Sequence, residues 1–137
     1  MSVATVRRLT ALLCILPAIA CRSDPSSARG TAERFLDAHY VSIDLQAAQA
    51  VTGGLAREKL DREIALVGEQ TIDATTRKPI VHYRFLSEQP AGEDAVYLAY
   101  LGQINVPDAE GFERRWLVTV RRAEHGWLVT NFQEVGD

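Results

Sequence analysis

His39 is the residue whose position in the sequence most directly allows chemistry. A helix over residues 31–43, with about 100° between successive residues, places His39 near the middle of an apolar stripe and beside Tyr40. A neutral imidazole in a dry pocket can act as a general base, and a nearby phenol can polarise a carbonyl group. The alternative is a core histidine hydrogen-bonded to a tyrosine or a backbone carbonyl. We favour this alternative, because no carboxylate partner for His39 is identified.

Aromatic side chains from several segments could line an apolar ligand pocket around His39. Aromatic residues at strand spacing also fill ordinary cores, so both uses stay open. The pocket candidates are Phe35, His39, Tyr40, Tyr83, Tyr100, Trp116 and Trp127.

Sites of other kinds find little support in the sequence. The three histidines stand on different expected elements, and neither an HExxH motif nor a cysteine pair is present, so we expect no metal site. Gly53 and Gly54 lack the spacing of a phosphate-binding loop, and we expect no cofactor. The formal net charge of −3 argues against a nucleic-acid partner.

Two arginine pairs bracket one expected strand. Arg114 and Arg115 stand at its start, and Arg121 and Arg122 at its end. They could bind anionic groups or an acidic partner. We favour a solvated strand whose charged ends discourage pairing with another edge.

The first twenty residues have the pattern of an export signal. Arg7 and Arg8 precede an apolar stretch over residues 9–20, which is short for a membrane span. Small residues then stand before Cys21, and the whole resembles a bacterial lipoprotein signal, in which the cysteine receives lipid. Ordinary signal-peptidase cleavage and an uncleaved signal anchor are the alternatives.

Removal of residues 1–20 changes the charge and leaves one cysteine. Two of the fifteen basic residues are lost, and thirteen against eighteen acidic residues give a net charge of −5. Cys21 is then the only cysteine, so the domain must be stable without an internal disulfide. Residues 21–30 (CRSDPSSARG) are expected to be a flexible tether, and residues 31–137 a single domain.

Three helices are expected at the start of that domain. Thr31 would cap the first, and Asp44 would cap a short second helix that ends at Gly53 and Gly54. The third would cover residues 55–67, with a buried stripe and a solvated charged face. The stripe comprises Ala56, Leu60, Ile64 and Val67, and the charged pairs are Arg57/Asp61, Glu58/Arg62 and Lys59/Glu63.

Strand-like patterns follow the helices. Residues 80–88, 95–104, 114–122 and 127–132 alternate or are apolar on both faces, and short turns separate them. A fifth strand would lie in the polar stretch 72–78. We expect both tryptophans in the core, and a bulge at Thr130 and Asn131 that turns Phe132 inward. The order predicts an α+β fold in which three helices pack on a curved antiparallel meander of four or five strands.

This order resembles the nuclear transport factor 2-like superfamily, also called the cystatin-like α+β fold, over about residues 31–135. The resemblance is carried by the opening TAERFLDAHY, the short helix after Asp44, and the closing WLVTVRR and GWLVTNF. It implies a cone with a pocket between the first helix and the sheet. Members include isomerases, dehydratases, cyclases and many non-catalytic modules, so the fold cannot select a function. Relatives resembling ketosteroid isomerase use pocket carboxylates and tyrosines, and no Asp or Glu stands here at an inward strand position.

We therefore expect an exported, lipid-anchored, non-catalytic module of the bacterial envelope. It would bind a hydrophobic small ligand or a protein partner, and a soluble periplasmic or secreted form is the alternative location. The alternative function is an isomerase or dehydratase with His39 as the base. Dimerisation through the outer face of the sheet stays open.

Overall fold

The computed structural model describes residues 23–68 and 77–136. It confirms the α+β class, with helices first and a four-stranded antiparallel sheet after them. The signal stretch, Cys21 and most of the polar stretch 72–78 lie outside the described residues. The elements are α1 (Ala28–Leu36), η1 (Asp37–Ser42), α2 (Leu45–Ala50), α3 (Gly54–Val67), β1 (Ile80–Pro90), β2 (Ala95–Asn105), β3 (Phe112–Ala123) and β4 (Gly126–Val135).

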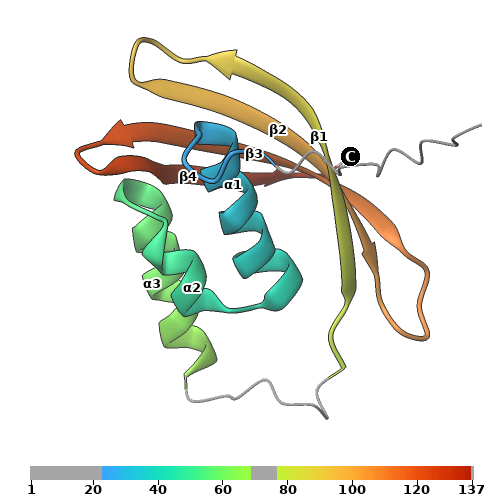
Figure 1. Ribbon diagram of the computed structural model, residues 1–137. Coiled ribbons are helices and arrows are strands. Elements are labelled where there is room, and N and C mark those ends of the chain that lie inside the picture. Colours follow the sequence, from blue (N-terminus) through green and yellow to red (C-terminus); the bar gives the residue numbers. More distant parts are fainter. Residues whose placement is uncertain (1–22, 69–76, 137) are drawn as a thin grey trace, which may run out of the picture.

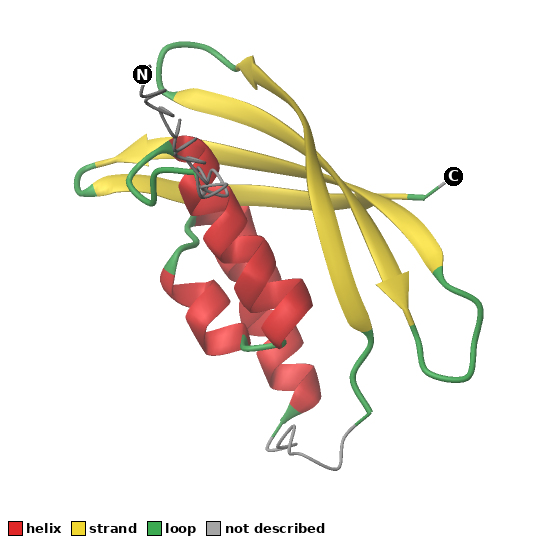
Figure 2. Ribbon diagram, turned by 45° about the vertical axis from the view of Figure 1, so that its right-hand side comes forward, coloured by secondary structure: helices red, strands yellow, loops and turns green. Residues whose placement is uncertain are grey.

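The four strands form a meander in the order β1-β2-β3-β4, because each pairs with its neighbour in the chain. The sheet is strongly curved, and all the helices lie on its concave side (Figure 1). The α1 helix begins at the end of the domain that holds the β1–β2 turn, and α3 ends at the opposite end (Figures 1 and 2). None of the helices in the described part of the chain is long and apolar enough to cross a membrane.

The expected bulge in the last strand is confirmed. Thr119 pairs with Asn131 and Val120 with Val129, so Thr130 is the extra residue. Val129 and Phe132, three positions apart, are consequently both buried.

The first helix begins earlier than expected. The Ser27 side chain, not that of Thr31, accepts the capping hydrogen bond from the Gly30 amide. Thr31 is instead buried inside the helix. The prediction of a flexible tether over residues 21–30 is therefore wrong for residues 23–30, which form a turn and the start of α1. The Asp44 cap of α2 is confirmed, with Asp44 Oδ1 2.9 Å from the Ala47 amide nitrogen.

The core fills the space between α1 and the sheet. Phe35 of α1, Tyr100 of β2 and Trp116 of β3 are fully buried there. Trp127 is only half-buried, and the Arg122 guanidinium lies 4.6 Å from its ring centroid. Of the two tryptophans expected in the core, only Trp116 is fully buried there.

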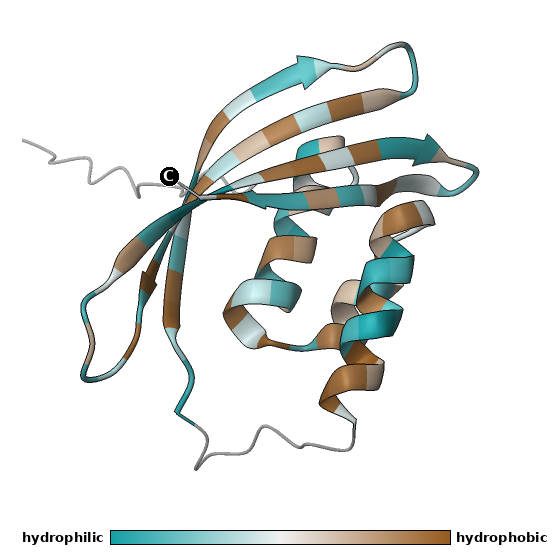
Figure 3. Ribbon diagram, turned by 180° about the vertical axis from the view of Figure 1, so that it is seen from behind, coloured by the Kyte–Doolittle hydropathy of each residue, from teal (hydrophilic) through white to brown (hydrophobic). Residues whose placement is uncertain are grey.

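The convex face of the sheet retains apolar side chains. Apolar and polar residues alternate along the strands (Figure 3). Tyr97 of β2 is 53% exposed and Leu117 of β3 is 40% exposed on the face away from the helices. The apolar pattern of the second strand thus reflects one buried side and one apolar exposed side.

Candidate ligand cavity

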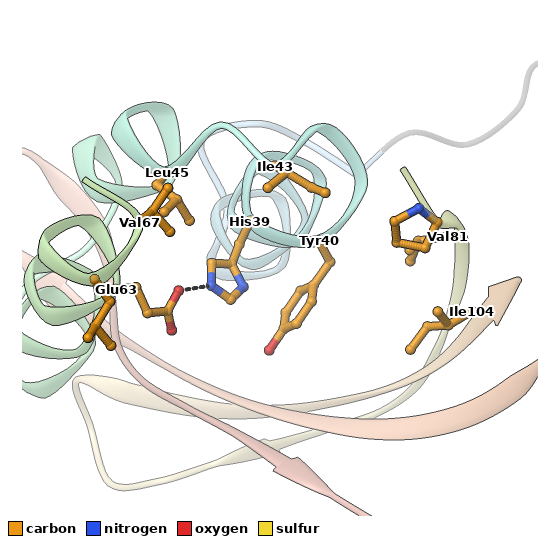
Figure 4. Close-up of a pocket in the computed structure, with 10 residues that line it drawn as sticks. His39, Tyr40, Ile43, Leu45, Glu63, Val67, Val81 and Ile104 are labelled. Atoms are coloured by element: carbon orange, nitrogen blue, oxygen red, sulfur yellow. Dashed lines mark hydrogen bonds and ion pairs between the residues drawn. The ribbon is translucent and has the colours of Figure 1, made fainter. Parts of the chain in front are cut away.

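A cavity of about 410 Å³ opens where η1, α3 and the paired ends of β1 and β2 meet. Its wall is almost entirely apolar, and its polar atoms come from His39, Tyr40 and Glu63 (Figure 4). The apolar lining residues are Ile43, Leu45, Leu66, Val67, Pro79, Val81 and Ile104. A concave apolar site with a few convergent polar groups is the usual form of a small-molecule site.

The backbone of η1 places two consecutive side chains at this cavity. Residues Asp37–Ser42 form a π-helix, a wider turn than an α-helix and one that is frequent at functional sites. His39 consequently stacks on Phe35 at 5.2 Å between ring centroids, while Tyr40 meets the same ring edge-on at 6.4 Å. The turn ends at Ile43 with a φ of 55°, a strained value for a β-branched residue.

His39 is paired with a carboxylate that the sequence reasoning missed. Its Nε2 lies 2.7 Å from Oε2 of Glu63 on α3 (Figure 4). An ionised carboxylate only accepts, so Nε2 carries the proton and donates it. The expected partner, a tyrosine or a backbone carbonyl, is therefore wrong. The Nδ1 atom is buried and has no hydrogen-bond partner among the described residues.

The sequence predicted that Lys59 and Glu63 would belong to a solvated face of the third helix. This prediction is wrong, because both side chains bond to other elements. Lys59 Nζ donates to Asn131 Oδ1 at 2.8 Å and to the carbonyl oxygen of Phe132 at 2.6 Å. Lys59 thus fastens α3 to β4, and Glu63 is left to pair with His39. Of the three expected helical pairs, Arg57 and Asp61 form an exposed ion pair at 3.5 Å.

Tyr40 lies between His39 and the core residue Trp116. Its ring stacks on Trp116 with 4.2 Å between centroids. Its hydroxyl makes no well-formed hydrogen bond within the described part of the chain, although the Glu134 carboxylate lies close enough to act on it. Burial raises the pKa of the Tyr40 phenol, and the negative charges of Glu134 and Glu63 raise it further. Tyr40 is therefore a protonated donor.

Only two of the seven pocket candidates line this cavity, namely His39 and Tyr40. Phe35, Tyr100 and Trp116 belong to the filled core, and Trp127 lies half-buried on β4. Tyr83 is held by η1, since its hydroxyl donates to Asp37 Oδ1 at 2.8 Å. Burial raises the pKa of both Tyr83 and Tyr100, and hydrogen bonding to Asp37 adds to the shift of Tyr83.

The apolar cavity residues were also missed by the sequence reasoning. Ile43 and Val67 were assigned to buried helix stripes, and Val81 and Ile104 to strand interiors, without a role in binding. The sequence signal that could have identified them is their position, because apolar residues at the ends of helices and strands are expected to be partly exposed. Val67 is 37% exposed and Leu66 is 86% exposed. Within the described residues, no group of three or more acidic, histidine or cysteine side chains could hold a metal ion.

Comparison with known proteins identifies the class of fold but assigns the chain to no family. No family model matches the chain, and no curated protein matches it. Solved structures do match, at sequence identities that speak for the fold alone.

Three of these structures define the class of fold. A domain of unknown function with a cystatin-like fold from Nostoc punctiforme has a TM-score of 0.60, 10% identity, and coverage of 80% of this chain and 74% of its own. An NTF-2 like protein of unknown function from Shewanella oneidensis has a TM-score of 0.56 and 8% identity, and the match covers 77% of this chain and 93% of that protein. A ketosteroid isomerase-like protein from Erwinia carotovora atroseptica has a TM-score of 0.52 and 12% identity, and the match covers 80% of this chain and 95% of that protein. The chain therefore has the cystatin-like α+β fold of NTF2-like proteins.

Proposed function

We propose that this protein is an exported, lipid-anchored, non-catalytic module of the bacterial envelope that binds a small apolar ligand in the cavity beside His39. The observation that supports ligand binding is the cavity wall, which is apolar except for a few polar atoms (Figure 4). Burying an apolar ligand against such a wall is favourable by roughly 25 cal/mol per Å² of apolar surface removed from water.

The envelope location rests on the sequence. Residues 1–20 have the pattern of an export signal, and Cys21 stands where a lipoprotein receives its lipid. The mass of the protein extracted from membranes tests this part directly. A diacylglycerol-modified Cys21 supports the anchor, and an unmodified chain that begins after residue 20 contradicts it.

A second candidate function is an isomerase or dehydratase with His39 as the base. The hydrogen bond that His39 Nε2 donates to Glu63 favours it, because a carboxylate that holds one ring nitrogen can orient a histidine for proton transfer. The nitrogen left to accept a proton, Nδ1, is buried on the side of the ring nearer Tyr40, which argues for a structural role (Figure 4). Replacing His39 with Gln separates the two, since unchanged ligand binding and unchanged turnover, together with altered stability, leave only the structural role.

Ligand binding is tested with a dye of the anilinonaphthalene sulfonate type, which becomes fluorescent in apolar surroundings. We expect Ile104→Trp, which fills the cavity, to remove most of the fluorescence increase. The matched control is Leu117→Trp, on the exposed convex face of the same sheet. Equal binding by the two variants would contradict the cavity, and loss in the Leu117 variant alone would move the site to the convex face.

A further inference from the structure

The arginines at the two ends of β3 are divided between the two faces of the sheet. The Arg114 and Arg122 guanidiniums each lie over an aromatic ring of the protein itself, 4.9 and 4.6 Å from the ring centroids. Arg115 and Arg121 form no ion pair with any residue that the structure describes. Both are exposed, and both lie on the convex face, because they share the alternate positions of β3 with Leu117. One arginine of each pair can therefore meet a partner on that face.

The first strand adds a third arginine to the convex face. Arg84 of β1 pairs with Leu101 of β2, and Leu101 pairs in turn with Arg115 of β3. Cross-strand partners share a face, and two strand spacings place Arg84 and Arg115 about 10 Å apart. Arg84 is exposed, and in the described part of the chain it has no acidic partner within ion-pair distance. The two guanidiniums thus flank Leu101.

Acidic residues are scarce on this face, although the chain as a whole has an acidic excess with a net charge of −3. Glu88 pairs with Leu98, and Glu134 pairs with Trp116. The side chains of Leu98 and Trp116 are buried in the core, so these two glutamates lie on the concave side. Among the acidic residues of the four strands, only Glu113 lies on the convex face. Three arginines against one glutamate make this face basic.

Apolar side chains lie between the basic ends of the convex face. A groove of about 470 Å³ is lined there by Tyr97, Leu117 and Arg115. Tyr97 and Leu117 are exposed, and in the strand register they fall between Arg115 and Arg121, which are about 20 Å apart. Tyrosine and arginine are the side chains that most often dominate binding at protein interfaces. The planar guanidinium also binds a carboxylate through two hydrogen bonds.

We propose that the convex face binds an acidic segment of another protein, with apolar side chains between two sets of carboxylates about 20 Å apart. This face is opposite the ligand cavity, so the inference does not rest on it. A second copy docked face to face is disfavoured, because the basic ends of both sheets would meet. An anionic bilayer is disfavoured because lipid-binding clusters usually contain about four to eight basic residues, and Glu113 offsets one of the three here.

The probe is a fluorescein-labelled peptide of about eight residues, acidic at both ends and apolar in the middle. A chain of residues 21–137 serves for the measurement, since its buried core lies between Ala28 and Phe132. Fluorescence anisotropy should show saturable binding that weakens with added salt. Arg115→Glu should weaken it roughly tenfold and should favour a peptide with lysines in place of the acidic residues. The matched control is Arg57→Glu, on the exposed side of α3, which makes the same change in net charge.

Several results would overturn the proposal. One is no binding by the parent, or equal binding by the parent and Arg115→Glu. Another is an equal loss in Arg57→Glu, which would reduce the effect to net charge. Arg115→Gln, similar in size and uncharged, should also bind more weakly, and circular dichroism checks that each variant is folded. Arg115-dependent binding to phosphatidylglycerol vesicles in place of the peptide would assign the face to a bilayer. A dimer in sedimentation equilibrium that Leu117→Glu dissociates would assign it to a second copy.

Discussion

The two halves of the helix formed by α1 and η1 meet the same sheet in different ways. The α1 half is close-packed, with Ala32, Phe35 and Leu36 fully buried. The η1 half has no fully buried residue, and His39 and Tyr40 on it line a cavity. The comparison shows how one continuous element can supply stability at one end and a binding surface at the other.

The backbone follows the same division. In α1 the hydrogen bonds are those of an ordinary helix with a serine cap. In η1 the turn is wider, and it closes on Ile43 in a left-handed conformation. Strained backbone of this kind persists only where surrounding contacts hold it, and it concentrates at functional sites. The strained residue Ile43 is thus itself part of the cavity wall.

The largest predicted effect distinguishes the filled core from the cavity wall. Trp116→Ala should lower the free energy of unfolding by about 3–5 kcal/mol, because it empties fully buried space beneath Tyr40. Ile104→Ala should cost clearly less, since Ile104 already borders a cavity and is only half-buried. Urea unfolding of both variants measures the difference. Equal losses would contradict the division into a filled half and an open half.

A second prediction concerns high pH. The pKa values of Tyr40 and Tyr100 are raised in the folded protein, so the folded state keeps protons that the unfolded state loses near pH 10. Stability should therefore be unaffected by these groups below about pH 10 and fall above it, by at most about 1.4 kcal/mol per pH unit for each tyrosine. Urea unfolding as a function of pH measures this, with Tyr40→Phe as the comparison. A Tyr40→Phe variant with an unchanged pH profile would exclude Tyr40 from the effect.

A third prediction concerns the ion pair on the cavity wall. Glu63→Ala should lower stability by about 1 kcal/mol, a modest value because the Glu63 side chain is 39% exposed. Glu63→Gln keeps an oxygen that can accept from Nε2 and should cost less. The two free energies of unfolding, measured at neutral pH, test this order. A larger loss for Gln than for Ala would mean that the bond to His39 is not the relevant contact.

The smallest prediction concerns the closed end of α1. Ser27→Ala should cost about 1 kcal/mol, because it removes the acceptor of the Gly30 amide. Thr31→Ser, which the sequence alone would rank as a capping change, should act only through lost methyl packing at a buried site. Thermal unfolding compares them. A Ser27→Ala variant as stable as the parent would place the start of the helix elsewhere.

Local patterns were sufficient to predict much of the fold. The period-two alternation after residue 80 and the turns at Pro90 and Gly92 define the meander, and the conflict between an inward Asn131 and an outward Phe132 predicts the bulge. The Asp44 cap is equally local, because the capping bond joins residues three positions apart.

The parts that were missed depend on contacts distant in sequence or on competition between caps. Glu63 reaches His39 across 24 positions, and the helical pattern offered Lys59 as a nearer partner. Lys59 instead bonds to Asn131, 72 positions away. Ser27 prevails over Thr31 as the cap because residues 24–27 form a turn in which Ser27 bonds back to Asp24, and Gly30 leaves room for this turn against the helix. The π-helix had no visible sequence signal.

The measurement that tests the central claim most directly is a methyl NMR titration of residues 21–137 with the apolar dye. The cavity account predicts saturable shifts at Ile43, Leu66 and Val81, together with small shifts at Leu117 and Leu101 on or near the convex face. Saturable shifts confined to Leu117 and Leu101, or the absence of saturation at the cavity methyl groups, would contradict it.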